Sequence, residues 1–190
     1  MKNGFFVEFG ACDGLTMSNT KLLEETYGWS GVLAEPNPIW RDSLFANRSC
    51  AISTDCVSSR TGETIDFIST EKNPELSRIA EIVPEDVHER EGNRQESTHI
   101  PVTTISLNHL LIQYTAPQIV DYLSIDTEGS EFEILRATDL DHWKFRFITV
   151  EHAGEQEKRS KIHSLLTSKG YERWRSDLSR WDDWYVLRTI

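Results

Sequence analysis

The chain has 190 residues, of which 38% are hydrophobic, and it carries a formal net charge of −11 at neutral pH. This length allows a sizeable core, and we expect a single domain over residues 1–190. The acidic balance argues against a nucleic-acid partner or an anionic membrane surface, because both need a basic face. A neutral or cationic small molecule is easier to accommodate.

Cysteine usage points to a reducing environment. Cys12, Cys50 and Cys56 form no C-x-x-C pair. A sparse, odd count is typical of reduced cytosolic proteins, so we expect a cytoplasmic protein. The sequence shows no secretory segment and no run long enough to span a bilayer. Its first apolar run lies almost at the start, so the domain is either minimal or separated from an upstream part.

The segment Gly4–Gly14, GFFVEFGACDG, joins a short apolar run to a turn. Phe and Val favour a strand, and Glu8 lies near its end. Gly10 allows the backbone to approach a ligand closely, and Gly14 relieves the turn. A strand, a glycine turn and a helix form the first unit of a nucleotide-type crevice, although an ordinary buried strand and turn would explain the same residues. The spacing E-x-G-x-x-x-G is not the dinucleotide fingerprint.

The next segment, residues 18–27, is expected to form a helix that Ser18 or Asn19 caps and that ends near Gly28. Its N-terminus points back at the glycine turn. Free backbone N–H groups there can bind a ligand carboxylate, with Ser18 and Asn19 as further candidate contacts. Simple capping of the helix is the competing interpretation.

A second buried strand, residues 31–35, ends on an acid, Glu35. Asn37 and Pro38 then favour the start of a helix. An acid at the carboxyl end of the second strand, about twenty residues beyond the glycine turn, accepts hydrogen bonds from ribose hydroxyls in nucleotide folds. We therefore expect Glu35 to bind a ribose, against the alternative of a solvated loop glutamate.

The middle of the chain is less regular. We expect a third strand at residues 49–53, and residues 56–57 and 64–68 flank a turn typical of a hairpin. From about residue 69 to 99 the pattern becomes polar and charged, which predicts an insertion or lid. Within it we expect a short helix over residues 74–82 and a solvated surface over residues 85–96.

Expected helices and strands alternate in the last part of the chain, from residue 106 onward. Helices are expected at residues 106–114, 131–137 and 158–169, and strands at 121–126, 145–150, 171–175 and 184–188. Ser106 is a candidate helix cap, and His109 is expected on the solvent side of its helix. Strands that alternate with helices predict an α/β fold with an open sheet and right-handed crossovers.

Acids follow strand after strand at the edge where ligands bind in such sheets. They are Glu8, Asp13, Glu35, Asp126, Glu128 and Glu151, the last followed by His152. If the backbone stays extended, the carboxylates of Asp126 and Glu128 face the same way. Trp174, Trp181 and Trp184, near the end of the chain, are candidates either for the core or for a pocket wall.

Three interpretations of this acidic group stay open. Asp126, Glu128 and Glu151 are oxygen donors that suit Mg²⁺, Ca²⁺ or Mn²⁺, and a metal there would lower the pKa of a bound hydroxyl. Alternatively, His152 is a general base that a carboxylate orients, with Asp126 and Glu151 beside it. In the third interpretation Asp126 and Glu128 only cap the helix after Ser130.

Six segments of the chain carry a resemblance to a known family: GFFVEFGACDGLTMSNT, GVLAEPNP, VTTISLNHLL, DYLSIDTEGSEFEILR, ITVEH and WDDWYVL. In these segments the chain resembles the FkbM family of S-adenosylmethionine-dependent methyltransferases. The segment DTEGSEFEIL followed by VEH is its most specific part. The similarity covers almost the whole chain apart from about residues 69–99. Many relatives carry additional upstream sequence.

This resemblance implies a single Rossmann-like domain with a mostly parallel seven-stranded sheet flanked by helices and an antiparallel strand near its end. It implies S-adenosylmethionine as methyl donor and O-methylation of a hydroxyl on a sugar or natural product. It places Glu8, Gly10, Asp13 and Gly14 on the donor turn and Glu35 on the ribose. Residues on the acceptor side would be Asp126, Glu128, Glu151 and His152. The alternative is a binding or scaffolding module with the donor fold and no catalysis.

Overall fold

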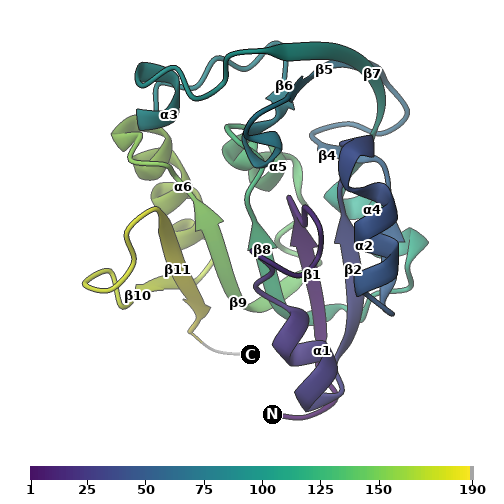
Figure 1. Cartoon of the computed structure of the whole chain (residues 1–190). Coiled ribbons are helices and arrows are strands. Elements are labelled where there is room, and N and C mark those ends of the chain that lie inside the picture. The colour runs from purple at the N-terminus through teal and green to yellow at the C-terminus, as the bar shows by residue number, and fades with distance from the viewer. Residues whose placement is uncertain (189–190) are drawn as a thin grey trace.

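The computed structural model describes residues 1–188, which form one large sheet with helices on both faces and a smaller sheet above it (Figure 1). The large sheet has seven strands in the order β10-β11-β9-β8-β1-β2-β3. Their bounds are β1 Phe5–Phe9, β2 Ser30–Ala34, β3 Ala51–Ser53, β8 Ile119–Ile125, β9 Lys144–Glu151, β10 Tyr171–Trp174 and β11 Asp182–Leu187.

Five consecutive strands, β9, β8, β1, β2 and β3, are parallel, whereas β11 pairs antiparallel with β9 and with β10. This mostly parallel sheet with an antiparallel edge is the predicted fold class. Because the carboxyl ends of parallel strands meet at one edge, the acids that follow β1, β2, β8 and β9 are brought together.

Five helices of the described chain cover this sheet: α1 Lys21–Tyr27, α2 Arg41–Asn47, α4 Leu107–Gln113, α5 Glu131–Ala137 and α6 Gln156–Ser168. A 3₁₀ turn, Pro38–Trp40, leads into α2, and the Asn37 side chain caps it as predicted. Ser106 likewise caps α4, and His109 is exposed. Helix α1 begins at Lys21, later than predicted, because the Asn19 N–H and the Ser18 hydroxyl both donate to Glu8.

Successive side chains of β1 point to opposite faces of the sheet, so they pack in two different hydrophobic clusters. Val7 and Phe9 belong to the larger cluster, which includes Leu110 of α4 and Leu135 of α5. Phe6 belongs to the other cluster, against α1 and α2. Both faces of β1 are therefore covered, which explains why its sequence is a nearly continuous apolar run rather than an alternating one.

The smaller sheet corrects the predicted hairpin. Its order is β4-β7-β5-β6, with bounds β4 Cys56–Ser58, β5 Thr64–Thr70, β6 Arg78–Ile79 and β7 Ser97–Ser106. Strands β4 and β5 do not pair with each other, because β7 lies between them, parallel to β4 and antiparallel to β5. The hairpin prediction was wrong because it considered only neighbouring segments and missed β7 as a strand.

The segment between β5 and β7 differs from its prediction in two ways. Instead of a helix over residues 74–82 there is a 3₁₀ turn, Pro74–Leu76, followed by β6, and the short helix α3 is Val87–Arg90. The prediction of a solvated surface over residues 85–96 is wrong for Asp86 and Arg94, whose exposed fractions are 1% and 9%. These two side chains are buried because they pair with each other.

Within residues 1–188, no helix has both the length and the apolar character needed to cross a membrane. The thiols of Cys12, Cys50 and Cys56 are free, and the loop that contains Cys12 is part of the candidate site described below.

Candidate active site

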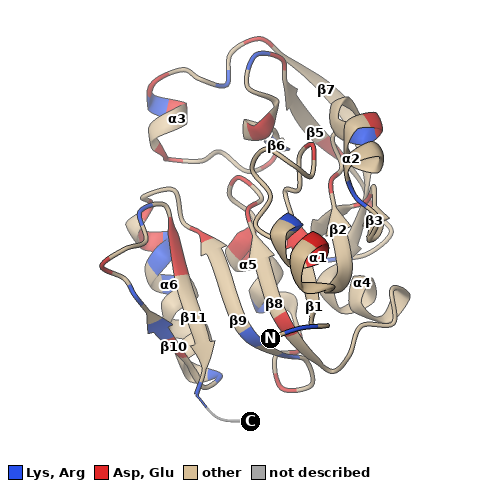
Figure 2. Cartoon of the chain, turned by 60° about the horizontal axis from the view of Figure 1, so that its bottom comes forward, with Lys and Arg blue, Asp and Glu red and all other residues tan. Residues whose placement is uncertain are grey.

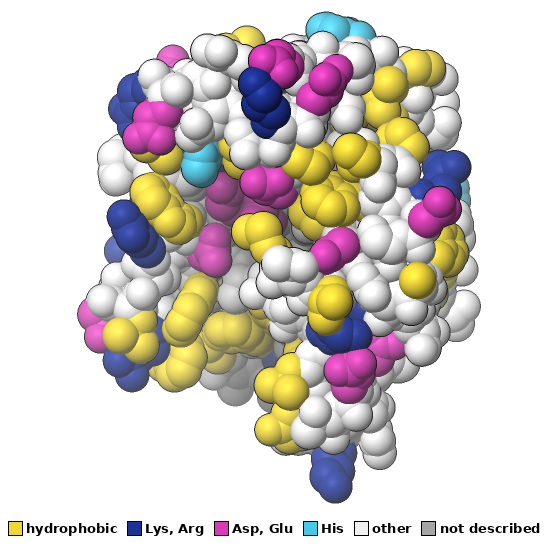
Figure 3. Space-filling model, viewed as in Figure 1, with side chains coloured by type: hydrophobic (Ala, Val, Ile, Leu, Met, Phe, Trp, Pro, Cys, Tyr) yellow, Lys and Arg dark blue, Asp and Glu magenta, His cyan; other side chains and the backbone are white. Residues whose placement is uncertain are grey.

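A cavity of about 700 Å³ opens at the carboxyl ends of β1, β2, β8 and β9. The smaller sheet and the segment before β11 complete its walls. Figure 3 shows a hollow with acidic side chains at its floor and apolar side chains around its rim, and Figure 2 shows acidic residues gathered at this edge of the sheet. Its acidic lining residues are Glu8, Glu35, Glu75, Asp126, Glu128, Glu151 and Asp182.

The turn after β1 lies directly against the end of β8. Gly10 has a φ of +70°, and a Cβ placed on it would lie 1.9 Å from the Asp126 carbonyl oxygen. Only glycine fits this combination of conformation and close approach. The close approach observed at Gly10 is to the backbone after β8, and it joins the two halves of the cavity.

Glu8 holds the loop between β1 and α1. Its carboxylate accepts hydrogen bonds from the Asn19 N–H at 2.7 Å, the Ser18 hydroxyl at 3.0 Å and the Thr20 hydroxyl. Arg48 lies 3.7 Å away and compensates its charge. Glu8 and Asn19 line the cavity, while these bonds fix the shape of the wall.

Glu35 follows β2 and is 7% exposed. Its two carboxylate oxygens accept the N–H groups of Cys12 at 3.0 Å and Asn37 at 2.8 Å. Burial raises the pKa of Glu35 to about 7, against the opposite effect of these two hydrogen bonds. Each oxygen keeps a second lone pair, so Glu35 can still accept a hydroxyl from a ligand in the cavity.

Three other residues that were predicted to bind the methyl donor do not line the cavity. Asp13 accepts the N–H groups of Leu15 and Thr16 and so braces the turn. Gly14 lies against α2, where a Cβ would come within 2.6 Å of Leu44. The Ser18 hydroxyl is held between Glu8 and Arg48. The geometry gives Asp13, Gly14 and Ser18 supporting positions instead of direct contact with a ligand.

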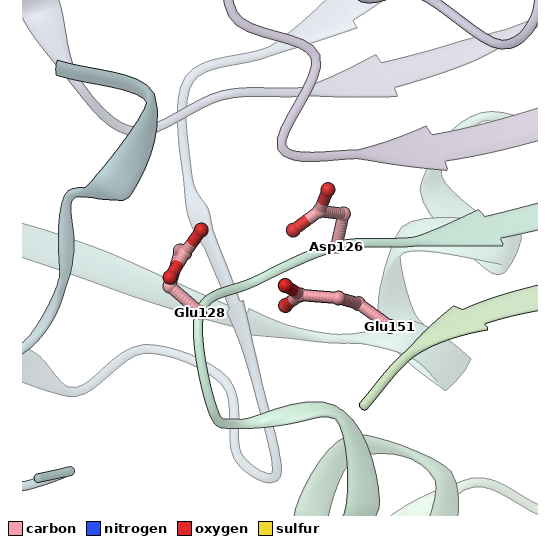
Figure 4. A group of neighbouring side chains, drawn as sticks. All are labelled: Asp126, Glu128 and Glu151. Atoms are coloured by element: carbon pink, nitrogen blue, oxygen red, sulfur yellow. The ribbon is translucent and has the colours of Figure 1, made fainter. Parts of the chain in front are cut away.

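The carboxylates of Asp126, Glu128 and Glu151 point toward one another (Figure 4). One oxygen of each lies within 4.8 Å of the others. The backbone does not stay extended as predicted, because Glu128 has a φ of +56°. The turn at Glu128, rather than a continued strand, directs its side chain toward the other two.

These three carboxylates are short of compensating positive charge. Burial and the neighbouring acids raise the pKa of Asp126 and Glu151 well above the ordinary range. Burial also raises the pKa of Glu128 to about 7, although Arg94 opposes it through a direct ion pair. Glu151 is 8% exposed, and its Oε2 has no hydrogen-bond partner among the described residues. The cluster therefore offers an unused acceptor to a proton, a cation or a hydroxyl.

His152 is not brought into the cavity. Its Nδ1 accepts the Gly154 N–H at 3.0 Å, so in the neutral ring the proton resides on Nε2, which lies 3.9 Å from Asp183. Burial and nearby Arg159 lower the pKa of His152. The imidazole has no free lone pair facing a ligand. The predicted role of general base therefore has no geometric support, because side chains alternate along the chain and Glu151, not His152, faces the cavity.

Comparison with known proteins identifies the family. The profile described as the methyltransferase FkbM domain matches residues 8–173. The chain belongs to the FkbM methyltransferase family. It is 36% identical over 63 residues to the methyltransferase sdnD of Sordaria araneosa, a match that covers 33% of this chain and 24% of that protein.

A solved structure supports the fold. The crystal structure of a methyltransferase FkbM from Methylobacillus flagellatus KT superposes with a TM-score of 0.56 at 13% identity, covering 97% of this chain and 43% of that one. The present FkbM chain thus spans less than half the length of either relative.

Membership of this methyltransferase family implies S-adenosylmethionine, and the cavity fits it. Its volume lies within the range of small-molecule sites. Gly10 lines the cavity without a side chain, Glu35 can accept hydroxyls, and the other acids suit a positively charged molecule. Burial raises the pKa of the Cys12 thiol, which keeps it protonated and unsuited to nucleophilic attack.

Several residues of this FkbM site escaped prediction. Asp182 lines the cavity, whereas its neighbour Asp183 is 1% exposed and binds Arg159. The last strand was expected to start at residue 184. A start at residue 182 would have placed Asp182 and Asp183 on opposite faces of the sheet, because side chains alternate along a strand. The role of Arg94 at the site was missed because its partner Glu128 lies 34 residues away in the sequence. Of the three candidate tryptophans, Trp181 and Trp184 line the cavity and Trp174 does not.

Proposed function

We propose that this chain transfers the methyl group of S-adenosylmethionine to a hydroxyl oxygen of a small molecule, such as a sugar or a natural product. The observation that carries this proposal is the joining of two half-sites, a glycine turn with Glu35 on one side and three convergent carboxylates on the other. No nucleic-acid partner is expected, because the cavity lining is acidic.

On the donor side, S-adenosylmethionine supplies an electrophilic methyl group when bound. Glu35 would accept the ribose hydroxyls. The Gly10 turn and Asn19 would hold the rest of the molecule against the ends of β1 and β8. The rigid backbone of this half would fix the donor in line with the acceptor oxygen.

On the acceptor side, Glu151 and Asp126 would orient the hydroxyl and take its proton. Glu151 Oε2 is free of protein partners among the described residues, and a carboxylate with a raised pKa is a stronger base than an ordinary one. This assignment replaces His152 as the base.

The same three carboxylates, Asp126, Glu128 and Glu151, also fit a divalent metal such as Mg²⁺. A bound metal would lower the pKa of the acceptor hydroxyl. Arg94 already pairs with Glu128, so Asp126 and Glu151 would be the principal ligands. Calorimetric titration of Mg²⁺ would test this arrangement.

The alternative is a binding module that holds the donor without catalysis. The free oxygen of Glu151 favours the enzyme, because a module that only binds the donor needs no unused acceptor beside it. Calorimetric titration with S-adenosylmethionine tests the donor site that both alternatives share. We expect saturable binding that Glu35→Ala weakens, and unchanged affinity in Glu35→Ala would contradict the assignment.

A further inference from the structure

The acceptor half of the cavity combines unpaired acids with aromatic side chains. Strand β11 presents Asp182 and Trp184 to the cavity, while Asp183 and Tyr185 point into the interior, 1% and 0% exposed. The carbonyl oxygen of Trp181, just before β11, accepts the N–H groups of His152 and Ala153 at 2.9 and 3.1 Å. Two backbone hydrogen bonds therefore fix Trp181 beside the end of β9.

Asp182 lies directly opposite Glu151 in the antiparallel pair of β11 and β9. Like charges at such positions destabilise a sheet unless something compensates them. Asp126 lies on the other side of Glu151, within the three-carboxylate cluster. Glu151 is thus flanked by two further acids and still has an oxygen with no partner among the described residues.

The nearby basic side chains are already engaged. Arg94 binds Asp86 and Glu128, and Lys158 binds Glu131 and Glu155 behind the cluster. Within the described lining, Arg180 is the sole Lys or Arg, and its guanidinium lies 4.8 Å from the centre of the Trp181 ring. Among the described residues, no basic side chain forms an ion pair with Glu151 or Asp182.

We propose that the methyl acceptor is a cationic ring compound, with a protonated amine that lies between Glu151 and Asp182 and a ring that packs on Trp181 and Trp184. This inference rests on the proposed methyl transfer and adds the class of acceptor. With Glu151 engaged by the amine, Asp126 would take the proton of the hydroxyl. An ammonium ion is attracted both by carboxylates and by the face of a tryptophan ring. An acceptor with a carboxylate or phosphate near its hydroxyl is repelled by the same residues.

Three probes of similar size separate charge from ring packing: benzylamine, benzyl alcohol and benzoate. Their binding to the full chain is measured by calorimetry at pH 7.5, with saturating S-adenosylhomocysteine and EDTA. We expect benzylamine to bind about tenfold more tightly than benzyl alcohol, which corresponds to ~1.4 kcal/mol, and benzoate to bind least. Equal affinities, or tighter binding of benzoate, would overturn the proposal.

Two variants locate the effect. Asp182→Asn keeps the shape of the side chain and is expected to remove most of the preference for benzylamine. Glu172→Gln, an exposed position on the neighbouring strand β10, removes the same charge outside the cavity and should leave the preference intact. A preference that survives Asp182→Asn, or that Glu172→Gln abolishes equally, contradicts the site.

In a last experiment the benzylamine titration is repeated with Mg²⁺ in place of EDTA. If Mg²⁺ binds and displaces benzylamine, the acids compensate their charge with a metal and the proposed amine site is wrong. Binding of S-adenosylhomocysteine is recorded separately in every case. Its absence would refute the methyltransferase proposal, whereas its presence without a preference for benzylamine would refute the class of acceptor alone.

Discussion

Gly10 and Asp126 lie in direct backbone contact, so that a single methyl group on Gly10 would come within 1.9 Å of the Asp126 carbonyl oxygen. This contact joins the turn that would hold the donor to the turn that carries the acidic cluster. At this point there is no room for a side chain between the two halves of the cavity.

Gly10→Ala is expected to lower the free energy of unfolding by about 2–4 kcal/mol, because it adds both left-handed strain and a clash in a packed interior. Gly62→Ala is the matched control. Gly62 has a φ of +82° but no atom within 4 Å of its Cβ position, so about 1 kcal/mol is expected. Urea denaturation followed by circular dichroism measures both. Equal losses in the two variants would show that the contact with Asp126 is unimportant.

Arg94 fastens the segment between β5 and β7 to the acidic cluster through buried ion pairs with Asp86 and Glu128. Arg94→Met would leave two buried carboxylates without their partner, and about 3–5 kcal/mol of stability should be lost. Limited proteolysis should then cut first within residues 74–94.

The control for Arg94 is Arg60→Met, because Arg60 forms an exposed pair with Glu63. Such a pair contributes about 0–1 kcal/mol, so little change is expected. If Arg94→Met unfolds no more easily than Arg60→Met and shows no new cleavage, this segment is not held by the ion pairs.

Glu35 should make stability depend on pH. Burial raises its pKa to about 7 in the folded chain, from an ordinary value of 4.5. Between these values the folded state binds more protons than the unfolded state. Glu35 therefore contributes stability that is present below about pH 4.5 and is lost as the pH rises to about 7.

Urea denaturation at several pH values tests this dependence. Glu35→Gln should flatten the decline between pH 4.5 and 7 relative to the unchanged chain, whereas Glu172→Gln should leave it unaltered. The same decline in Glu35→Gln would mean that another group causes it.

A variant of His152 shows whether this residue stabilises the cavity wall or takes part in ligand binding. His152→Ala removes the acceptor of the Gly154 N–H and should cost about 1–3 kcal/mol of stability. Affinity for S-adenosylhomocysteine should stay within about twofold, since the imidazole does not line the cavity. Thermal unfolding and calorimetry measure the two effects. Loss of binding with unchanged stability would place His152 back in the site.

The central sheet could be predicted from the sequence because its signals are local. The apolar run of β1 and the acids after β1, β2, β8 and β9 show both the strands and the edge at which they meet. The position of Glu35 in the cavity wall could be predicted because Glu35 follows a buried strand directly. The position of a residue can be predicted from the sequence when its neighbours along the chain determine that position.

The smaller sheet and the surroundings of the acids could not be predicted in the same way. Strand β7 pairs with β4 and β5 across long sequence separations, and Arg94 meets Glu128 across 34 residues. Which of Glu151 and His152 faces the cavity depends on how the end of β9 lies in the sheet between β8 and β11. Non-local pairing and the direction of a side chain after a strand end are set by the folded chain as a whole.

The most direct test of the proposed function is a crystal structure of the chain with S-adenosylhomocysteine. We predict that the ribose hydroxyls lie within hydrogen-bond distance of Glu35 and that the sulfur faces Asp126 and Glu151 across the Gly10 turn. A molecule bound elsewhere, or in this cavity with its ribose away from Glu35, would contradict the account.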